Sequence, residues 1–470
     1  MGVEVKYTKI DASQLTLDEI QEIGSSIVNK TFREIYDSKE ISTKGGFGHF
    51  IEKYVFNFDP NNDSRPDFIT AKAELKVTPV RKNKNGTYSA KERLVLNVIN
   101  YENEVHSSFY TSSFWQKNAT LYILFYLYSP SVNKLDYLIL KEHLLEFEKL
   151  KKDLLIIKRD WEIIHNKIRD GKAHEISEAD TMYLGACTKG VNSKSLRNQP
   201  NSHILAKQRA YSLKQSYMTQ VFNRVPLDES INLMVDGVEL EKLGFESLLE
   251  NKLMRFIGKS QNELKTMLNV TSTSKNINEL LISAMLGLEN TKVSKTDEFM
   301  KANIIPKTIR LEDNGTIREH MSFKPFDFIN LVEQSWDDSD LKNYFETTKF
   351  MFALFQKSGS QYYFKGVKFW NMPIYDIEND LKEVWERTVN VLKKGMIVSK
   401  ITHVTENFFP KATQNRVAHV RPHAKDSKDE YPLPVPDIHT NKTSFTKQGF
   451  WLNKEYVLEV LKTLFVNKDN

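Results

Sequence analysis

The sequence has a single cysteine, no long apolar run and little excess charge, and each shortage excludes a class of protein. Cys187 alone cannot form an internal disulfide framework or a zinc site built on several cysteines. The longest strongly apolar run, Leu121–Tyr128, is far shorter than the roughly 20 residues of a membrane span. The first residues lack the basic and then apolar pattern of a signal peptide, and Lys6 breaks the N-myristoylation motif. We therefore expect a soluble cytoplasmic protein.

What is present is an ordinary globular composition. The chain has 470 residues, of which 40% are apolar and 27% are charged, so it can form two domains with sizeable cores. The net charge is +5, and basic residues gather in Lys189–Arg209 and Arg416–Lys428. Such clusters are compatible with a polyanionic partner, although each could equally be a solvated loop.

Four short matches occur in the same order in the two halves of the chain, which indicates an internal duplication. Two of them are a capping-box pattern and a tryptophan followed ten residues later by a glycine suited to a helix C-terminus. In order, the matched segments are Lys30–Ile35 with Lys259–Leu264, Trp161–Gly171 with Trp385–Gly395, 192–194 with 426–428, and 209–217 with 448–456. We predict two homologous domains, residues 1–230 and 245–470, joined by a linker at 231–244.

Each half mixes strand and helix patterns, which predicts an α/β fold of the mixed type. Leu94–Ile99 and Leu121–Tyr128 are typical of buried strands. Leu135–Ile164 is predicted to be helical with one or two breaks. Asn85-Gly86 predicts a hairpin that joins Leu75–Pro79 to Leu94–Ile99.

The residues best suited to chemistry are two carboxylates and a lysine in the first half. Glu74 and Lys76 alternate along a predicted strand and therefore project from one face, and Asp67 precedes them from a turn. Converging carboxylates repel each other unless a cation joins them, and their oxygen ligands suit Mg²⁺. Glu52 on a predicted helix could add a third carboxylate. The alternative is an edge strand with a solvated ion pair, because this spacing is permissive.

These motifs, in order, resemble the MutH family of GATC-specific DNA endonucleases. The resemblance rests on Lys44–Glu52 and on Pro66–Pro79, which carries a Glu-Leu-Lys strand. It continues in Tyr183–Leu196, similar to the family's DNA-reading loop, and in Arg209–Tyr217. One departure is that Cys187-Thr188 replaces the arginine-proline pair that precedes the loop lysine in the family.

The resemblance implies a restriction-endonuclease fold, a central mixed sheet flanked by helices. It implies that Asp67, Glu74 and Lys76 are catalytic, with Asp67 and Glu74 as Mg²⁺ ligands and Glu52 assisting. The residues expected to contact DNA are Lys44, Lys189, Lys194, Arg209, Tyr211, Lys214 and Tyr217.

The second half keeps the pattern of the repeat and loses its carboxylates. Ser283 stands at the position of Glu52, and Ile305 at that of Glu74. The arginine-proline pair of the loop is retained as Arg421-Pro422. We therefore expect this half to bind DNA without cutting it, as an allosteric domain. Its predicted DNA contacts are Arg421, His423, Lys428, Asn453 and Lys454.

A doubled chain with one inactive copy resembles the MutH-like type II restriction endonucleases. The resemblance implies hydrolysis of both strands of duplex DNA at unmethylated GATC, with the cut before the G, and we expect stimulation by a second DNA site. We expect a monomer that dimerises on DNA, and a cognate methyltransferase on another chain. Two alternatives remain: a nicking endonuclease of mismatch repair, and a non-enzymatic sequence-specific DNA-binding protein.

Overall fold

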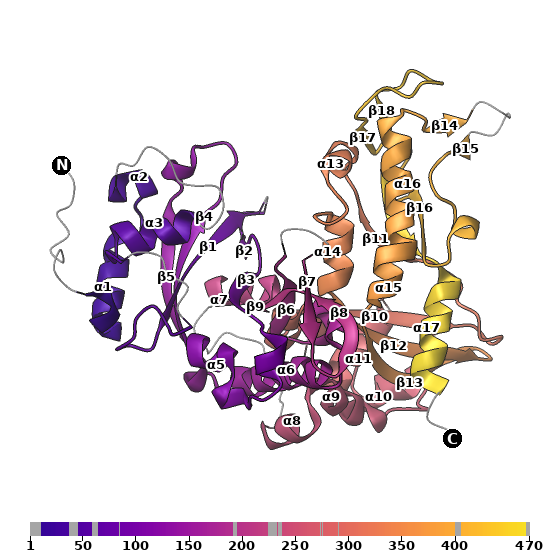
Figure 1. The fold of residues 1–470 in the computed structure, drawn as a ribbon. Helices are drawn as coiled ribbons and strands as arrows, with labels where there is room; N and C mark the ends of the chain where they lie inside the picture. The colour runs from indigo at the N-terminus through magenta and orange to yellow at the C-terminus, as the bar shows by residue number, and fades with distance from the viewer. Residues whose placement is uncertain are drawn as a thin grey trace. The chain divides into compact units, whose positions relative to one another are not determined.

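A computed structural model describes residues 11–36, 46–58, 64–83, 85–190, 195–223, 233, 237–272, 274, 276–289, 291–399 and 406–466. The chain divides into two compact units. Unit 1 comprises Met1–Phe245 and Ser294–Asn303, and unit 2 comprises Glu246–Val293 and Ile304–Asn470. Both units combine sheets with helices, which confirms the mixed α/β class (Figure 1). Within the described residues, no helix is both long enough and apolar enough to cross a membrane.

Unit 1 is built on a mixed sheet with the strand order β2-β1-β4-β5. β1 (Glu74–Lys82) runs parallel to β4 (Thr120–Leu127), whereas β2 (Tyr88–Ala90) and β5 (Ile139–Glu146) pair antiparallel. Helices α1 (Leu17–Ile27) and α3 (Gly46–Tyr54) lie beside this sheet (Figure 1). Leu75 and Tyr122 belong to the apolar core shared by the sheet and α3. The opposite side of β1, which carries Glu74, is thereby left for polar groups.

A second, antiparallel sheet of unit 1 has the order β3-β9-β6, and a separate hairpin joins β7 to β8. The strands are β3 (Leu94–Val98), β6 (Leu184–Thr188), β7 (Leu196–Gln199), β8 (Ser202–Lys207) and β9 (Arg209–Leu213). The remaining helices of this unit are α2 (Phe32–Ile35), α4 (Tyr101–Glu104), α5 (Ser113–Asn118), α6 (Lys151–Arg169), α7 (Gln215–Asn223), α8 (Gly237–Leu243) and α12 (Asp297–Ala302).

Unit 2 repeats this arrangement of strands. Its first sheet has the order β10-β12-β13, with β10 parallel to β12 and β13 antiparallel, as in β1-β4-β5. Its second sheet, β11-β19-β16, is antiparallel like β3-β9-β6, and β17 and β18 form the matching hairpin. The strands are β10 (Ile304–Leu311), β11 (Met321–Pro325), β12 (Lys349–Ser358), β13 (Gln361–Trp370), β14 (Val398–Ser399), β15 (Glu406–Asn407), β16 (Ala418–Pro422), β17 (Glu430–Pro432), β18 (Ser444–Thr446) and β19 (Gln448–Leu452).

The helices of unit 2 also have counterparts in unit 1. α16 follows the first sheet as α6 does, and α17 follows β19 as α7 follows β9. The helices are α9 (Phe245–Met254), which begins at the unit boundary, α10 (Gln261–Met267), α11 (Ile277–Met285), α13 (Phe328–Glu333), α14 (Asp340–Thr347), α15 (Ile374–Asp376), α16 (Lys382–Lys393) and α17 (Lys454–Val466).

The register of the strands confirms the duplication residue by residue. Leu213 in β9 lies opposite Leu184 in β6, and Leu452 in β19 lies opposite Ala418 in β16. Both capping boxes predicted from the repeat are present, with Thr31 and Ser260 as the N-cap residues. The two units therefore share one fold.

One residue is inserted in the long helix of unit 2. In unit 1 the Tyr217 hydroxyl donates to Asp153 at 3.0 Å, eight residues before Trp161. In unit 2 the Tyr456 hydroxyl donates to Asp376 at 2.7 Å, nine residues before Trp385. The extra residue is accommodated in a π-helical turn, Ile377–Leu381, between α15 and α16. A wider turn of this kind absorbs one added residue without breaking the helix.

Two local predictions are wrong. The predicted helix Leu135–Ile164 contains β5, because Ile139 and Leu145 pair with the buried strand β4, and helix α6 begins only at Lys151. The Asn85-Gly86 turn does close a hairpin, but the strand that returns beside β1 is β2. Leu94–Ile99 supplies β3 of the other sheet instead.

The units differ from the predicted domain boundaries in two segments. The predicted linker contains α8, whose Leu240 is buried and whose neighbour in unit 1 is α6. Ser294–Asn303 belongs to unit 1, where α12 packs on α7 and Lys301 pairs with Asp153 at 2.9 Å.

Candidate active site

Strand β1 places Glu74 and Lys76 on one side of the central sheet. Glu74 lies opposite Leu121 of the parallel strand β4, and Lys76 lies opposite Ile123. Glu74 is only 4% exposed. The Lys76 ammonium donates to Glu74 Oε1 at 2.7 Å, so that the two side chains form a partly buried ion pair.

Asp67 is brought to the same place by a tight reversal of the chain. Phe68 and Ala73 exchange two backbone hydrogen bonds, which return the chain to β1 directly beside Asp67. The Leu75 amide then donates to Asp67 Oδ2 at 3.0 Å, and the Asp67 amide donates to Glu74 Oε2 at 3.2 Å. The two carboxyl groups are therefore fixed to the start of β1 by the backbone itself.

Glu52 and Lys117 complete the cluster. Glu52 projects from α3, and its Oε2 atom is buried with no hydrogen-bond partner among the described residues. Lys117 projects from α5, and its ammonium lies 3.6 Å from Glu74 Oε1. The structure therefore brings together Glu52, Asp67, Glu74 and Lys76, the residues predicted to be catalytic, and adds Lys117. Sequence reasoning missed Lys117, although a basic residue just before the strand parallel to β1 was a usable signal.

Burial is the main influence on the pKa values of Asp67 and Glu52 in the cluster. Burial raises the pKa of Asp67 from 3.8 to about 7, and the negative charge of Glu74 adds to the shift. Lys76, the Leu75 amide and Lys117 oppose it. Burial also raises the pKa of Glu52. In the described residues, no three Asp, Glu, His or Cys side chains are grouped as a complete metal site.

Four of the residues predicted to contact DNA are buried instead. Arg209 donates to the carbonyl of Ala186 at 2.6 Å and to that of Ile176, and Lys214 donates to the carbonyl of Thr181. Because their charged groups serve carbonyls of their own unit, these placements do not support contact with DNA.

The two tyrosines of that segment are fully buried as well. Tyr211 donates to Glu104 at 2.8 Å, and Tyr217 donates to Asp153 at 3.0 Å. Alternation along β9 could not distinguish Tyr211 from a surface residue, because this strand is buried on both faces, and Tyr217 lies on the buried side of α7. We assign all four residues a structural role.

The remaining predicted contacts of unit 1 lie near its hairpin. Lys189 is exposed, and its amide donates to the Gln208 carbonyl at 2.8 Å, beside the β7–β8 hairpin. Lys44 and Lys194 lie outside the described residues. Lys189 is therefore the predicted base or phosphate contact that the structure places at the surface.

Of the residues predicted to form the second DNA site in unit 2, some are exposed and one is buried. Arg421 is exposed, with its guanidinium 4.9 Å from the Trp451 ring centre, and Lys428 is exposed as well. The His423 amide donates to the carbonyl of the residue before β19, just as the Lys189 amide donates to the carbonyl of the residue before β9. The half-buried His423 therefore occupies the position of Lys189. The partly exposed Lys454 begins α17.

Asn453 is buried, which contradicts the prediction that it contacts DNA. Its amide nitrogen donates to the carbonyls of Asn415 and Arg416, at 2.7 and 3.1 Å, and its oxygen lies 2.6 Å from His419 Nδ1. Lys214 serves the equivalent carbonyl in unit 1. Asn453 thus has the structural function of Lys214 without its charge.

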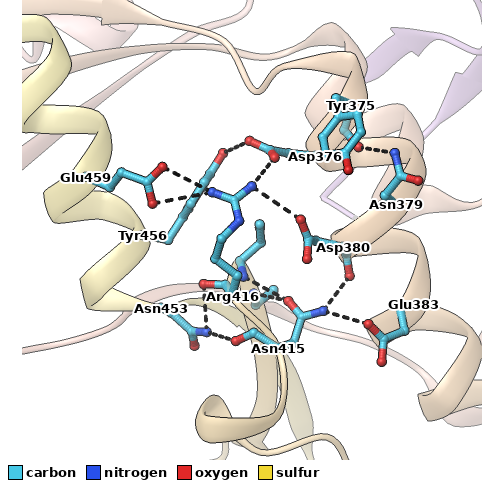
Figure 2. A network of polar contacts seen from close by, with 12 residues as sticks. Tyr375, Asp376, Asn379, Asp380, Glu383, Asn415, Arg416, Asn453, Tyr456 and Glu459 are labelled. Atoms are coloured by element: carbon cyan, nitrogen blue, oxygen red, sulfur yellow. Dashed lines mark hydrogen bonds and ion pairs between the residues drawn. The ribbon is translucent and has the colours of Figure 1, made fainter.

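Arg416 organises the surroundings of Asn453 in unit 2. Its guanidinium lies between Asp376, Asp380 and Glu459 and over the ring of Tyr456 (Figure 2). The inserted π-helical turn supplies Asp380 to this network. The network joins α15, the approach to β16 and α17.

The catalytic positions of unit 2 lack the carboxylates of unit 1. Ile305 lies opposite Phe350, the second residue of β12, just as Glu74 lies opposite the second residue of β4. Ser283 is buried and binds the Glu279 carbonyl and the Val293 amide. Glu298, the nearest match to Asp67 in sequence, belongs to unit 1 and accepts from the Leu233 amide.

Two comparisons with known proteins agree with this site. The family model described as the DNA mismatch repair enzyme MutH matches residues 56–160, which include Asp67, Glu74, Lys76 and Lys117. The chain is also 36% identical to the type II restriction enzyme Sau3AI of Staphylococcus aureus. That alignment covers 96% of this chain and 99% of the relative. The chain therefore belongs to the MutH-like family of type II restriction endonucleases.

Proposed function

We propose that this restriction endonuclease hydrolyses both strands of duplex DNA at unmethylated GATC, before the G, in a Mg²⁺-dependent reaction. The observation that carries the proposal is the cluster of Asp67, Glu74 and Lys76, held together in unit 1 and absent as a set from unit 2. The sequence and cut position rest on the resemblance of the Lys44–Glu52 and Pro66–Pro79 motifs to the MutH family.

The residues of the cluster fit a divalent cation. Glu52 Oε2 is a buried oxygen with no hydrogen-bond partner among the described residues. Burial, and after it the negative charge of Glu74, raises the pKa of Asp67, and a bound cation would offset both effects. Mg²⁺ is commonly bound by one or two carboxylates together with phosphate oxygens and water, so Asp67 and Glu74 would suffice as protein ligands. When bound, Mg²⁺ polarises a phosphoryl oxygen and lowers the pKa of a water ligand.

The side chains around the metal site have the remaining roles in the reaction. The Lys76 ammonium, held at 2.7 Å by Glu74, orients the attacking water and offsets charge that develops on the phosphate. Lys117 supplies a second positive charge on the same carboxylate. Glu52 assists from α3. The backbone bonds of Asp67 and Leu75 fix this geometry before DNA arrives.

Unit 2 serves as a second DNA-binding domain in this proposal. It keeps the fold and the exposed Arg421, but its catalytic position is Ile305. Two chains assemble at a cleaved palindrome, because each chain carries one active site and two strands are cut. A second DNA site bound by unit 2 favours the active assembly. Self-protection comes from a methyltransferase acting on the same DNA.

Supercoiled plasmid with GATC sites tests the proposal against its alternatives. The proposed enzyme yields linear fragments in the presence of Mg²⁺. A mismatch-repair nickase would yield nicked circles, and a binding protein would leave the plasmid intact while retarding it in a gel. The nickase has the family model in its favour, but 36% identity over nearly the whole chain to a restriction enzyme favours the double-strand cut.

A further inference from the structure

Lys301 is a buried lysine of unit 1 that comes from the second half of the sequence. It lies in α12, within Ser294–Asn303, and the residues on both sides of this segment belong to unit 2. Its ammonium donates to both carboxylate oxygens of Asp153 in α6, at 2.9 and 3.0 Å. Lys301 is 7% exposed and Asp153 is 8% exposed. Removing one partner of a buried ion pair is strongly destabilising, so this pair fixes α12 on unit 1.

Lys301 has the place in unit 1 that Arg416 has in unit 2. In each unit the cation pairs with the aspartate of the long helix and lies over the ring of the tyrosine that donates to that aspartate. The Lys301 ammonium is 5.8 Å from the ring centre of Tyr217, and the Arg416 guanidinium is 5.1 Å from that of Tyr456. Figure 2 shows the arrangement in unit 2. The two units therefore build the same contact with cations from different parts of the chain.

The position of Arg416 is occupied in unit 1 by an uncharged residue. β6 begins at Leu184 and β16 begins at Ala418, and these two residues have the same place in the register of their sheets. Arg416 stands two residues before β16, and the residue two before β6 is Met182, which is buried. Unit 1 thus receives through α12 the cation that unit 2 supplies from its own sheet.

Helix α7 connects α12 with the strand beside β1. The Ser216 hydroxyl of α7 donates to the Lys301 carbonyl at 2.7 Å, and α12 packs along α7. The side-chain amide of Gln215, also in α7, donates to the carbonyl of Ala90 at 2.8 Å. Ala90 ends β2 and lies opposite Val80 of β1, the strand that carries the candidate catalytic residues. A contiguous series of contacts within unit 1 therefore runs from α12 to that strand.

The other end of α12 continues directly into the first strand of unit 2. The helix ends at Ala302, Asn303 adopts the left-handed conformation with φ 54°, and β10 begins at Ile304. Ile305, the counterpart of Glu74, is the next residue. A change in the position of β10 therefore acts on α12, because no flexible linker separates them.

We propose that α12 couples the second DNA site of unit 2 to the active site of unit 1, with Lys301 as the positioning residue that holds α12 in place. This inference deepens the proposed function and rests on it. The pair of Lys301 with Asp153 fixes α12, and α7 transmits the position of α12 to β2 and β1. DNA bound by unit 2 then accelerates cleavage by unit 1 only while this pair is intact.

Initial cleavage rates with Mg²⁺ on plasmids with one GATC site and with several test this inference. The informative quantity is the ratio of the two rates, because a general loss of activity or of folded protein lowers both rates alike and leaves the ratio unchanged. We expect a several-fold ratio for the wild-type protein and a ratio of about 1 for Lys301→Gln. Lys301→Arg keeps the charge and should restore most of the ratio. Lys295→Gln changes an exposed lysine of the same segment and is the matched control.

A second variant tests the contact between α12 and α7 without removing a buried charge. Ser216 is half-buried, and Ser216→Ala removes the hydrogen bond to the Lys301 carbonyl. We expect this variant to fold and to lower the ratio about twofold or more. It decides the question if circular dichroism shows that Lys301→Gln is unfolded.

The outcomes separate this inference from the proposed function. A wild-type ratio of about 1 overturns the stimulation by a second site and this inference together. A several-fold wild-type ratio that folded Lys301→Gln retains overturns this inference alone. If Lys301→Gln does not fold, retention of the ratio by Ser216→Ala overturns it instead. Loss of the ratio in Lys295→Gln as well would also overturn it, because the effect would then not depend on the pair with Asp153.

Discussion

At position 74, a carboxylate that is 4% exposed lies 2.7 Å from the ammonium of Lys76 and 3.6 Å from that of Lys117. Glu74→Ala removes an oxygen ligand and its charge, so cleavage should fall by more than about 10³-fold. DNA affinity should be retained, because phosphate contacts elsewhere supply most of it and the site loses a negative charge. Initial cleavage rates and gel-shift affinities measure both effects. Glu102→Ala, at an exposed position of α4, is the control, and wild-type turnover by Glu74→Ala would disprove the assignment.

The raised pKa of Asp67 predicts that the stability of the metal-free protein depends on pH. Its pKa is about 7 in the folded, metal-free protein, against 3.8 for an ordinary aspartate. Between these values the folded chain holds a proton that the unfolded chain has released, so the free energy of unfolding falls as pH rises from about 4 to 7. Asp67→Asn removes this loss and should stabilise the metal-free protein at pH 8 by roughly 1–3 kcal/mol, with little effect near pH 4.

Urea unfolding in EDTA, at pH 4.5 and at pH 8, measures the difference in the free energy of unfolding between the wild-type protein and Asp67→Asn. Added Mg²⁺ should stabilise the wild-type protein at pH 8 and have a smaller effect on the variant. Equal destabilisation by Asp67→Asn at both pH values would contradict the electrostatic explanation.

Single residues also show what the sequence could predict. The proximity of Asp67, Glu74 and Lys76 could be predicted because it depends on spacing along one strand and its preceding turn, whereas their catalytic role stays a prediction that rests on the family resemblance. Arg209 and Lys214 were misassigned because the sequence does not show that their charges are buried against carbonyls. Lys117 was missed because its approach to Glu74 depends on the pairing of β1 with β4, which lies far along the chain.

At the scale of elements, local signals predicted helix ends better than strand partners. The capping boxes at Thr31 and Ser260 are present, and Gly171 and Gly395 adopt the left-handed conformation after their helices. β5 was mistaken for helix because its edge position leaves charged residues half-buried, which obscures the alternation of a strand. Partner choice depends on contacts between distant segments, so local patterns could not determine it.

The network around Arg416 gives a prediction for the elements it joins. Arg416→Ala leaves Asp376, which is 6% exposed, without its cation and should lower the free energy of unfolding of unit 2 by about 1–2 kcal/mol. The loss stays this small because the Arg416 side chain is 42% exposed, which weakens its pairing. Lys382→Ala removes an exposed pair with Glu386 in α16 and should cost less than about 0.5 kcal/mol. Chemical denaturation measures the free energy of unfolding of both variants. Equal losses of stability in Arg416→Ala and Lys382→Ala would contradict a special role for the network.

At the scale of the whole molecule, the order of four short matches predicted a duplication that the strand order of both units confirms. The sequence did not reveal that Ser294–Asn303 belongs to unit 1, because α12 joins α7 through packing rather than through any repeat. Residue type alone predicts that unit 2 has lost a metal ligand at Ile305, since an aliphatic side chain cannot bind a metal, and this loss of function stays a prediction.

The proposed roles of the two units, cleavage by unit 1 and binding of a second DNA site by unit 2, predict coupling between DNA sites. Plasmids with several GATC sites should be cut several-fold faster than plasmids with one, because a second site favours the active assembly by roughly 1–3 kcal/mol. Arg421→Ala should remove the advantage, since Arg421 is an exposed basic residue near the end of β16 in unit 2. Initial rates for both proteins on both plasmids measure the effect. Equal rates in all four combinations would reject the allosteric role of unit 2.

The central claim is site-specific double-strand cleavage by the cluster at Asp67, Glu74 and Lys76. It is tested most directly by digesting unmethylated and methylated GATC DNA with Mg²⁺ and sequencing the ends. We predict breaks in both strands before the G, with four-base 5′ overhangs and 5′-phosphates, on unmethylated DNA only. Breaks at other sequences, nicks in one strand, or identical cutting by Glu74→Ala would contradict this claim.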